Sequence, residues 1–482
     1  ARYLDWAVGL AKKSSHAADP SIFDFVRDVL LALKAQGKSK ADQTAVCAFA
    51  MKFQQYSAPV MAKAVEDTTF YQYYRLAALN EVGGEPHRFG MSPAAFHRQN
   101  QERARRWPHA MLATSTHDTK RSEDVRARIS VLSEMPDEWN RALSRWSKLN
   151  HGKRRIQDAG SAPSRNDEYL LYQTLLGVWP SFGPLSSPGI EGARNAPGVP
   201  DAAGLAQLSA RVEAYMLKAG REAKVNSSWF NPNTEYEEAM RDFVRALLCP
   251  QPDNPFLQDF LPFQQRIARV GAFNSLSQVL LKLTSPGVPD IYQGNEVWNF
   301  SLVDPDNRRM VDYEARHAAL RAIKTLYADA GTAACAQHLL ENLPDGRIKL
   351  YLTWKILTLR REHEAVFRDG DYLPLKVYGE HAEQVVAFTR HSGEETLLAA
   401  APRLFGGLMG DHGQPPVGEA AWGDTWIEVP PERVHEKWTN TLTDETFDTQ
   451  VRGKTQGLPL AQLFGTFPYA LLHVQRGTAT EI

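Results

Sequence analysis

Six ionisable side chains crowd into eight positions of the segment 117–124, namely His117, Asp118, Lys120, Arg121, Glu123 and Asp124. They follow the apolar run 110-AMLA-113 and the small hydroxylated residues 114-TST-116. Lys120 and Arg121 come directly after a carboxylate, so either can set the ionisation of Asp118 or bind a hydroxyl group of a ligand. The alternative interpretation is a solvated helix start, in which the acids favour the positive end of the helix dipole.

The elements that would position these residues are a strand before them and a helix after them. A strand that ends in polar residues just before a helix is typical of the βα unit of an α/β barrel or a doubly wound sheet, where functional groups collect at the carboxyl ends of strands. The same organisation recurs in 277–309, where an apolar run breaks into Gly, Pro, Tyr292, Gln293 and Asn295. We therefore expect the two strand ends to face one pocket.

Composition excludes several classes of partner. The chain has 482 residues, 43% of them hydrophobic, which is enough for a large core and about three domains by length. It carries 55 basic and 56 acidic residues, so neither a nucleic acid nor a membrane surface is indicated, and an uncharged partner is expected. The three cysteines, Cys47, Cys249 and Cys335, form no C-x-x-C pair. They indicate a reducing compartment rather than a disulfide framework or a zinc site.

No apolar run approaches the roughly 18 residues of a membrane span, and no signal peptide is evident, so a cytoplasmic location is expected. The chain opens without Met on a segment that already has helical periodicity.

Periodicity divides the chain into helical and strand-rich regions. The first 60 residues are helical in pattern, as are the stripes Val125–Ile129–Leu132 and Trp139–Leu143–Trp146, the latter after Pro136. Thr234 and Glu237 predict a capping box at the start of another helix. These apolar stripes are interpreted as core. Residues 180–204 hold five prolines and five glycines, which predicts a surface loop. After about residue 370, short apolar runs separated by Gly, Pro and Asp predict an antiparallel β domain.

Four long segments carry a family resemblance. They are 63-KAVEDTTFYQYYRLAALNEVGG-84, 114-TSTHDTKRSEDVRARI-129, 167-DEYLLYQTLLGVWP-180 and 284-TSPGVPDIYQGNE-296, the last followed by 302-LVDPDNRR-309. In this order they resemble the maltooligosyltrehalose synthases, which are members of the α-amylase family of glycoside hydrolases. The resemblance extends over nearly the whole chain.

The resemblance implies a fold of class α/β: part of a (β/α)8 barrel, about strands six to eight, with a large helical insertion and a C-terminal β-sandwich-like domain. It places strand six near 59–67, strand seven at 109–118 and strand eight at 279–294. The implied domains are 1–121, the barrel part with strands six and seven; 122–270, a mainly helical insertion; 271–369, strand eight and closing helices; and 370–482, the β domain.

The resemblance also implies an activity. The family moves the α-1,4 bond at the reducing end of a maltooligosaccharide to an α,α-1,1 bond, which leaves a trehalose end unit, and it needs neither cofactor nor metal. Enzymes of this kind use a nucleophile, a general acid/base and a third carboxylate that stabilises the oxocarbenium-like transition state. Asp118 matches the third carboxylate, and His117 matches the residue beside it that binds the sugar.

The family's strand-four nucleophile and strand-five acid motifs have no match here. Either the chain is the C-terminal portion of a longer synthase, or other carboxylates have taken these roles. Glu66 and Asp67 are the tempting substitutes, yet neighbours on a regular strand point to opposite faces. We therefore favour a longer synthase and expect this chain alone to be inactive. An α-glucan hydrolase and a non-catalytic glucan-binding part remain alternatives.

The predicted site therefore has one catalytic residue and a set of binding residues. Asp118 is the expected transition-state stabiliser. Some of the aromatic side chains Phe70, Tyr71, Tyr73 and Tyr74 are expected to stack on released glucose and exclude water, while others belong to the core. The loop 304-DPDNRR-309 is interpreted as carbohydrate-binding rather than metal-binding, because it lacks a calcium-loop pattern. The predicted substrate-binding residues are His117, Glu66, Asp67, Phe70, Tyr71, Tyr73, Arg75, Asn80, Glu81, Lys120, Arg121, Tyr292, Gln293 and Asn295.

Overall fold

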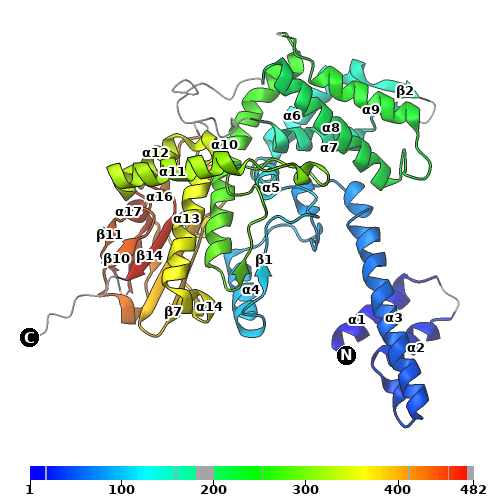
Figure 1. Ribbon diagram of the computed structural model, residues 1–482, viewed down its shortest axis with the longest axis horizontal. Helices are drawn as coiled ribbons and strands as arrows, with labels where there is room; N and C mark the ends of the chain where they lie inside the picture. The colour runs from blue at the N-terminus through cyan, green and yellow to red at the C-terminus, as the bar shows by residue number, and fades with distance from the viewer. Residues whose placement is uncertain are drawn as a thin grey trace, which may run out of the picture. The chain divides into compact units, whose positions relative to one another are not determined.

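The computed structural model describes residues 1–16, 19–157, 160–180, 200–251, 253–410, 413–453 and 455–474. The chain divides into two compact units, Ala1–Tyr73 and Tyr74–Ile482 (Figure 1). The division at residue 73 differs from the four predicted domains, whose boundaries stay predictions. Within the described residues, no helix is both long enough and apolar enough to cross a membrane.

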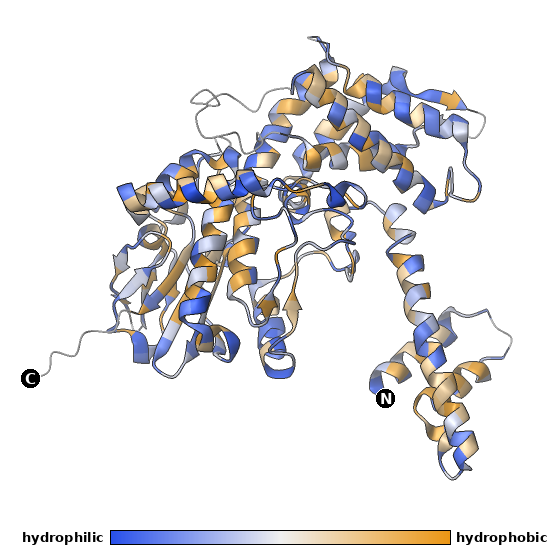
Figure 2. Cartoon of the chain, in the orientation of Figure 1, coloured by the Kyte–Doolittle hydropathy of each residue, from blue (hydrophilic) through white to orange (hydrophobic). Residues whose placement is uncertain are grey.

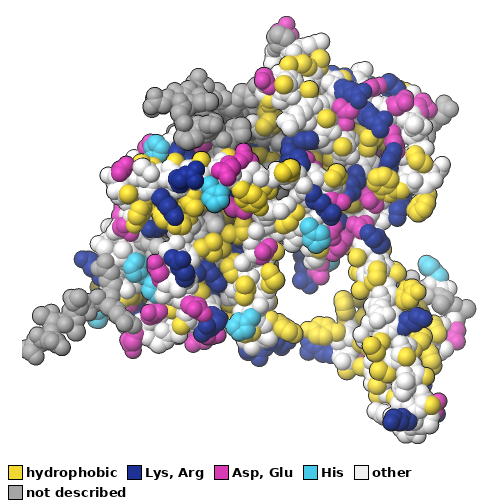
Figure 3. Space-filling view, in the orientation of Figure 1, with side chains coloured by type: hydrophobic (Ala, Val, Ile, Leu, Met, Phe, Trp, Pro, Cys, Tyr) yellow, Lys and Arg dark blue, Asp and Glu magenta, His cyan; other side chains and the backbone are white. Residues whose placement is uncertain are grey.

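The first unit is helical, as the periodicity predicts. It contains α1 (Arg2–Ser14), α2 (Ser21–Leu30) and α3 (Lys40–Val65). Ser39 caps α3, since its hydroxyl accepts a hydrogen bond from the backbone N–H of Asp42. Apolar side chains such as Tyr3, Trp6 and Tyr56 are exposed on this unit. Figure 3 shows hydrophobic side chains spread over its visible surface.

The prediction of a strand at 59–67 is wrong, because residues 59–65 form the last turns of α3. The helix is rich in Ala, Gln, Lys and Met, which favour helices, and it accommodates Pro59 in its interior. A parallel strand needs a hydrogen-bonded neighbour, and the described residues of this unit contain no strand. Glu66 is therefore the residue at which α3 ends rather than part of a strand.

The second unit contains most of the helices. Its longer helices are α4 (Pro93–Arg106), α5 (Glu123–Ser130), α6 (Pro136–Leu149), α7 (Arg165–Val178), α8 (Ala202–Ala223), α9 (Thr234–Leu247), α10 (Pro255–Thr284), α11 (Tyr313–Ala330), α12 (Thr332–Glu341) and α13 (Arg347–Glu362). Shorter ones are α14 (Glu364–Arg368), α15 (Phe405–Leu408), α16 (Glu419–Trp422) and α17 (Leu460–Leu463).

The predicted apolar stripes of α5 and α6 are confirmed as core. Val125 and Ile129 are fully buried, and Pro136 occupies the first turn of α6 as predicted. Trp146 packs edge-on against Tyr172 of α7 and Phe256 of α10. Figure 2 shows apolar residues along α10, the longest helix described. These contacts join α5, α6, α7 and α10 into one helical layer.

The cap of α9 differs from the prediction by one residue. Asn233, not Thr234, is the cap, and its side chain accepts a hydrogen bond from the N–H of Tyr236. Glu237 is free for other partners and pairs with Arg221. Of the predicted loop at 180–204, residues 181–199 lie outside the described residues, and α8 already begins at Ala202.

Two very short strands support the loops that carry the predicted chemistry. β1 (Met111–Leu112) and β4 (Val288–Pro289) pair in parallel, with Met111 opposite Val288. Gly287, with φ of 128°, allows this approach, since a Cβ there would lie 2.7 Å from the Ala110 carbonyl oxygen. The segments expected to form strands seven and eight thus contain two adjacent, parallel strands that are far shorter than predicted.

Residues 279–284, predicted to begin strand eight, belong to α10 instead. A short apolar run cannot by itself distinguish a buried strand from a buried helix. No other parallel pair occurs in the part of the chain that the structure describes, so the barrel assignment is not established.

The C-terminal region contains the predicted antiparallel sheets. One sheet has the order β11-β10-β14-β8-β7-β5 and the other β12-β13-β9-β6. Their bounds are β5 (Asp371–Pro374), β6 (Val377–Tyr378), β7 (Val385–Ser392), β8 (Glu395–Pro402), β9 (Trp426–Glu428), β10 (Trp438–Asn440), β11 (Thr446–Phe447), β12 (Gln450–Arg452), β13 (Thr455–Pro459) and β14 (Ala470–Val474). The strands β2 (Arg155–Gln157) and β3 (Gly160–Ala162) form a separate hairpin.

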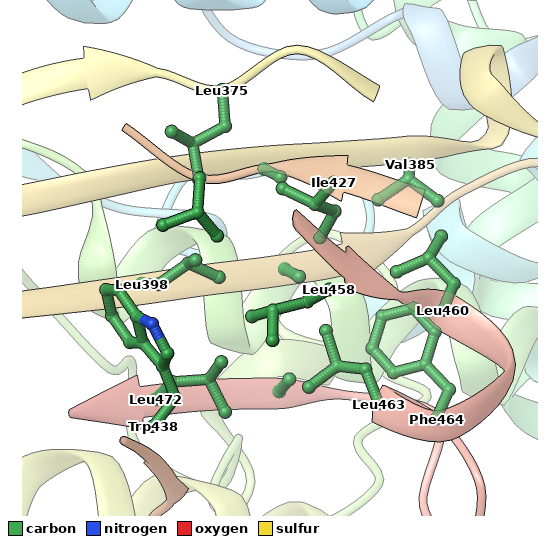
Figure 4. Packing of buried hydrophobic residues seen from close by; sticks show 14 of the residues in the cluster. Leu375, Val385, Leu398, Ile427, Trp438, Leu458, Leu460, Leu463, Phe464 and Leu472 are labelled. Atoms are coloured by element: carbon green, nitrogen blue, oxygen red, sulfur yellow. The ribbon is translucent and has the colours of Figure 1, made fainter. Parts of the chain in front are cut away.

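The core of this region draws side chains from both sheets. Leu398 and Leu472 come from the six-stranded sheet, and Ile427 and Leu458 come from the four-stranded one (Figure 4). All four are buried within one apolar cluster. Two facing sheets with a shared core correspond to the sandwich-like arrangement that the sequence predicts.

Candidate functional site

The loop between β1 and α5 presents the candidate carboxylate. The Thr119 hydroxyl donates to the Thr116 carbonyl at 3.0 Å, and the Asp118 N–H donates to the Thr116 hydroxyl at 3.2 Å. These local bonds close the loop as Thr and Asp side chains commonly do. His117 and Asp118 remain exposed at its tip. The loop therefore offers an imidazole and a carboxylate at the end of a parallel strand.

A second loop, which follows β4, is joined to the first. The Asp290 N–H donates to the Leu112 carbonyl at 2.8 Å, which continues the parallel pairing. The Tyr292 hydroxyl donates to the Asn307 carbonyl at 3.3 Å, and the Asn307 amide donates to the His117 carbonyl at 3.1 Å. The two strand ends predicted to face each other are thus connected through Asn307.

Asn295 differs from its neighbours in this second loop. It is only 2% exposed, and neither polar atom of its side chain has a partner among the described residues. Gln293 is exposed, whereas Tyr292 is half-buried. A buried amide without partners is costly unless something else satisfies it.

The loop 304–309 is held by cations from α8. Arg211 forms two hydrogen bonds to the Asp306 carboxylate, at 2.9 and 2.8 Å, and the Lys218 ammonium lies 2.8 Å from Asp304. Burial opposes ionisation of Asp306, but the bonds from Arg211 outweigh it and hold the pKa of this carboxyl below its usual value. Within the described ranges, no group of His, Cys, Asp and Glu is placed to hold a metal ion.

Glu81 and Arg121 hold the first loop in place through hydrogen bonds to buried parts of the protein. Glu81 accepts the backbone N–H groups of Lys120, at 2.7 Å, and Arg121, at 3.2 Å, and it pairs with Arg126. The Arg121 side chain is buried and donates to the Tyr215 hydroxyl of α8 at 2.6 Å. Both side chains are thus engaged with the protein itself.

The start of α5 is a buried ion cluster, so the interpretation of a solvated helix start is wrong. The Lys349 ammonium, from α13, lies 2.7 Å from Glu123 and 2.9 Å from Asp124. Lys282 of α10 lies 3.5 Å from Glu123. All four side chains are buried, because α5 packs against α10 and α7 rather than facing solvent. The paired charges compensate one another's desolvation.

Comparisons with known proteins identify the family. A curated Mycobacterium tuberculosis protein named maltooligosyl trehalose synthase is 36% identical over 423 residues, which is 88% of this chain and 45% of the relative. The structure of the maltooligosyltrehalose synthase from Arthrobacter ramosus matches 98% of this chain and 51% of that chain, with a TM-score of 0.73 and 30% identity.

The chain belongs to the maltooligosyltrehalose synthase family.

A further crystal structure of a maltooligosyl trehalose synthase covers 94% of this chain and 54% of its own, with a TM-score of 0.65 and 30% identity. No protein-family model matches the chain. The resemblance seen in the four sequence segments is confirmed. The chain spans about half the length of the curated synthases it matches.

The remaining predicted site residues fall in two places. Phe70 and Tyr71 are buried in a 3₁₀ turn of the first unit, where Tyr73 is exposed and Asp67 pairs with Lys63. In the second unit, Asn80 is buried, and the Arg75 guanidinium stacks on the Phe89 ring at 4.8 Å. Because the two units are each described by themselves, the binding roles of these residues in the synthase site stay predictions.

Sequence reasoning missed three residues around the synthase candidate site. Asn307 lies in a loop that the sequence singles out, but its amide was not assigned a partner. Arg211 lies on an amphipathic helix and shows no signal of its own. Lys349 does carry a signal, since it interrupts the apolar segment Ile348–Leu352, and a lysine there needs a buried acid.

Proposed function

We propose that this chain is part of an enzyme that converts the reducing-end α-1,4 bond of maltooligosaccharides into an α,α-1,1 bond by intramolecular transglucosylation. The observation that carries the proposal is an open His117–Asp118 pair at the end of a parallel strand, in a chain 36% identical to a protein named maltooligosyl trehalose synthase. The substrate is a neutral sugar, which agrees with the balanced charge of the chain.

Asp118 is assigned the role of stabilising positive charge on the sugar ring. Its carboxylate is exposed and has no hydrogen-bond donor assigned to it among the described residues, so it is available to a ligand. The charge contributes most when the ring becomes oxocarbenium-like, which lowers the barrier more than it strengthens substrate binding. Covalent transfer also needs a nucleophile and a proton donor, for which no motif in this chain provides a match.

Binding of the sugar is assigned to the polar groups around the two loops. His117, Tyr292 and Gln293 supply donors and acceptors at the strand ends, whereas Lys120 is buried beneath the loop. Asn295 is assigned as a further contact, because its buried amide lacks partners that sugar hydroxyls would supply.

Products separate this function from simple hydrolysis. The test is incubation of maltopentaose with a polypeptide that carries this sequence and spans the full length of its relatives, termed here the full-length synthase. Intramolecular transfer yields a non-reducing product of unchanged mass with an α,α-1,1 linkage, detected by NMR and by loss of reducing ends. Accumulation of glucose with maltotetraose as the main products would identify an α-glucan hydrolase instead.

A further inference from the structure

We propose that Asn307 is a positioning residue that fixes the position of the His117–Asp118 backbone in the loop that follows β1. This inference rests on the proposed function for its catalytic consequence, and on contacts described above for its physical basis.

The side-chain amide of Asn307 donates hydrogen bonds to two backbone carbonyls of the loop between β1 and α5. Its Nδ2 lies 3.1 Å from the His117 carbonyl oxygen and 3.5 Å from that of Thr116. Both neighbours are acceptors, so only the NH2 end of the amide can face them. The carbonyl that receives the shorter bond belongs to the residue directly before Asp118, so the orientation of that peptide unit fixes where the Asp118 side chain begins.

Asn307 is itself held directly by Tyr292 and through its neighbour Asp306. Tyr292 donates to the Asn307 backbone carbonyl at 3.3 Å, and Arg211 forms two hydrogen bonds to the Asp306 carboxylate. The Leu302 N–H also donates to the Asp306 carboxylate at 2.8 Å. Because the Asn307 amide is itself fixed, its hydrogen bond restrains the His117 carbonyl. An amide on a mobile loop would move together with that carbonyl and would not restrain it.

The arrangement makes α8 part of the positioning system. Arg211 lies on α8, so the helix acts on Asp118 through Asp306 and Asn307 without touching the loop tip. Loss of the Asn307 amide should therefore displace the Asp118 carboxylate. Misplacement by about 1 Å can cost a reaction roughly 100-fold in rate.

The first experiment measures hydrogen exchange in the 482-residue chain itself and needs no activity. In Asn307→Asp, a carboxylate faces the two carbonyls, and in Asn307→Ala the donor is absent. Peptides spanning 113–122 are expected to exchange about five- to tenfold faster in both variants. Asn342→Asp is the matched control, since Asn342 also donates its amide to a carbonyl, that of His338 at the end of α12. It should leave 113–122 unchanged.

The second experiment measures kinetics in the full-length synthase with maltopentaose. Asn307→Asp and Asn307→Ala are expected to lower kcat about 10- to 100-fold with KM changed less than about threefold, because the binding groups of the second loop stay in place while the Asp118 charge is displaced. The ratio of free glucose to trehalose-ended product should rise. In the exchange experiment, which contains no substrate, Tyr292→Phe removes the hydroxyl that donates to the Asn307 backbone carbonyl and should speed exchange at 113–122 less than the Asn307 variants do.

The outcomes are distinguishable. Unchanged exchange at 113–122, wild-type kcat and product ratio in both Asn307 variants, or an equal loss in Asn342→Asp would each overturn the positioning role. A rise in KM with kcat unchanged would also overturn it, since Asn307 would then bind substrate. If the unmodified full-length synthase made no trehalose-ended product, the proposed function would fail, while the exchange result would still decide whether Asn307 holds the loop.

Discussion

At the scale of single residues, the candidate site depends on a carboxylate that the fold leaves open. Glu81, Glu123 and Asp124 lie near the same loop, but each is engaged by cations or backbone N–H groups. Asp118 follows a strand end and is exposed. The contrast supports the proposal that Asp118 acts on the substrate, whereas the other three carboxylates hold the fold around it.

The first prediction concerns Asp118→Asn in the full-length synthase. We expect kcat to fall by about two to three orders of magnitude or more, with maltooligosaccharide binding largely retained, because the charge acts mainly in the transition state. Steady-state kinetics and binding calorimetry measure the two quantities. Asp329→Asn, an exposed position near the end of α11, is the control. A variant that kept near wild-type kcat would show that Asp118 is only structural.

The second prediction concerns Arg390, which joins three elements. Its guanidinium donates to the carbonyls of Thr284, Val366, Phe367 and Gly370 at 2.9–3.2 Å, and burial lowers its pKa to about 10. Arg390→Lys cannot supply this planar set of donors, so we expect a loss of roughly 2–4 kcal/mol in the free energy of unfolding. Thermal denaturation of the chain measures it.

The control for Arg390 is Arg368→Lys, because Arg368 is exposed and pairs only with neighbours on its own segment. A surface pair of this kind contributes little, so its melting temperature should stay close to wild type. Equal melting temperatures for Arg390→Lys and the unmodified chain would contradict the role assigned to Arg390.

At the scale of elements, α5 is fixed by charge as well as by packing. Glu123 and Asp124 at its first turn share the Lys349 ammonium from α13, and Lys282 of α10 approaches Glu123. Burial raises the pKa of the Glu123 carboxyl, but Lys349 and Lys282 outweigh it and lower that pKa to about 2. The helix that follows the candidate loop is thereby tied to two other helices.

The third prediction follows from the depressed pKa of Glu123. A carboxyl whose pKa is lower in the folded state contributes stability that is full above its unfolded value, near 4.5, and is lost as pH falls towards 2. The contribution is about 3 kcal/mol at neutral pH. Glu123→Gln should therefore be less stable at pH 7 and lose less stability than wild type between pH 4.5 and 3, as measured by urea unfolding.

Two points make this comparison specific. Burial raises the pKa of Asp124, and the neighbouring Glu123 charge raises it further, so its own contribution has the opposite sign and is smaller in Glu123→Gln. Glu364→Gln, at an exposed position on α14, should reproduce the wild-type profile. An acid profile for Glu123→Gln that matched wild type would show that the ion cluster does not stabilise the fold.

Element types were predictable where a long periodic pattern existed. The stripes of α5 and α6 and the alternating runs after residue 370 gave the correct structure, because burial of one face decides it. The segments 59–65 and 279–284 were predicted as strands but are helical. Both are short apolar runs, and each is helical because it continues a long helix that begins many residues earlier.

The candidate site was predictable only in part for the same reason. A strand end followed by charged residues located His117 and Asp118, and a second strand end located Tyr292. The partners that hold them, Asn307 and Arg211, come from a distant loop and helix, so no local pattern could reveal them.

At the scale of the whole molecule, the chain covers about half the length of the synthases it matches. The proposed retaining transfer requires three carboxylates, and the motifs of this chain match one of them, Asp118. The remaining two are the subject of the last prediction, which concerns the 482-residue chain on its own.

The fourth prediction is that this chain, verified by intact mass and incubated with maltopentaose, makes neither trehalose-ended product nor glucose. Without a nucleophile the covalent intermediate cannot form, and one stabilising carboxylate cannot replace it. Product analysis by NMR and mass spectrometry provides the measurement, with the full-length synthase as the positive control. Turnover at about 1 per second or faster would require an unrecognised carboxylate pair, to be sought among Glu66, Asp67, Glu81, Asp118, Asp290 and Glu296.

The bond between Asn307 and His117 also bears on how the protein is made. These residues are 190 positions apart, so on a ribosome the loop bearing Asp118 emerges long before the residue that restrains it. Contacts of such separation form late in folding, after the intervening helices have packed. Nascent chains that stall before residue 307 would therefore carry the candidate carboxylate on an unrestrained loop. The loop can be restrained only after residue 307 has been synthesised, so products that terminate before this residue lack the bond that orders it.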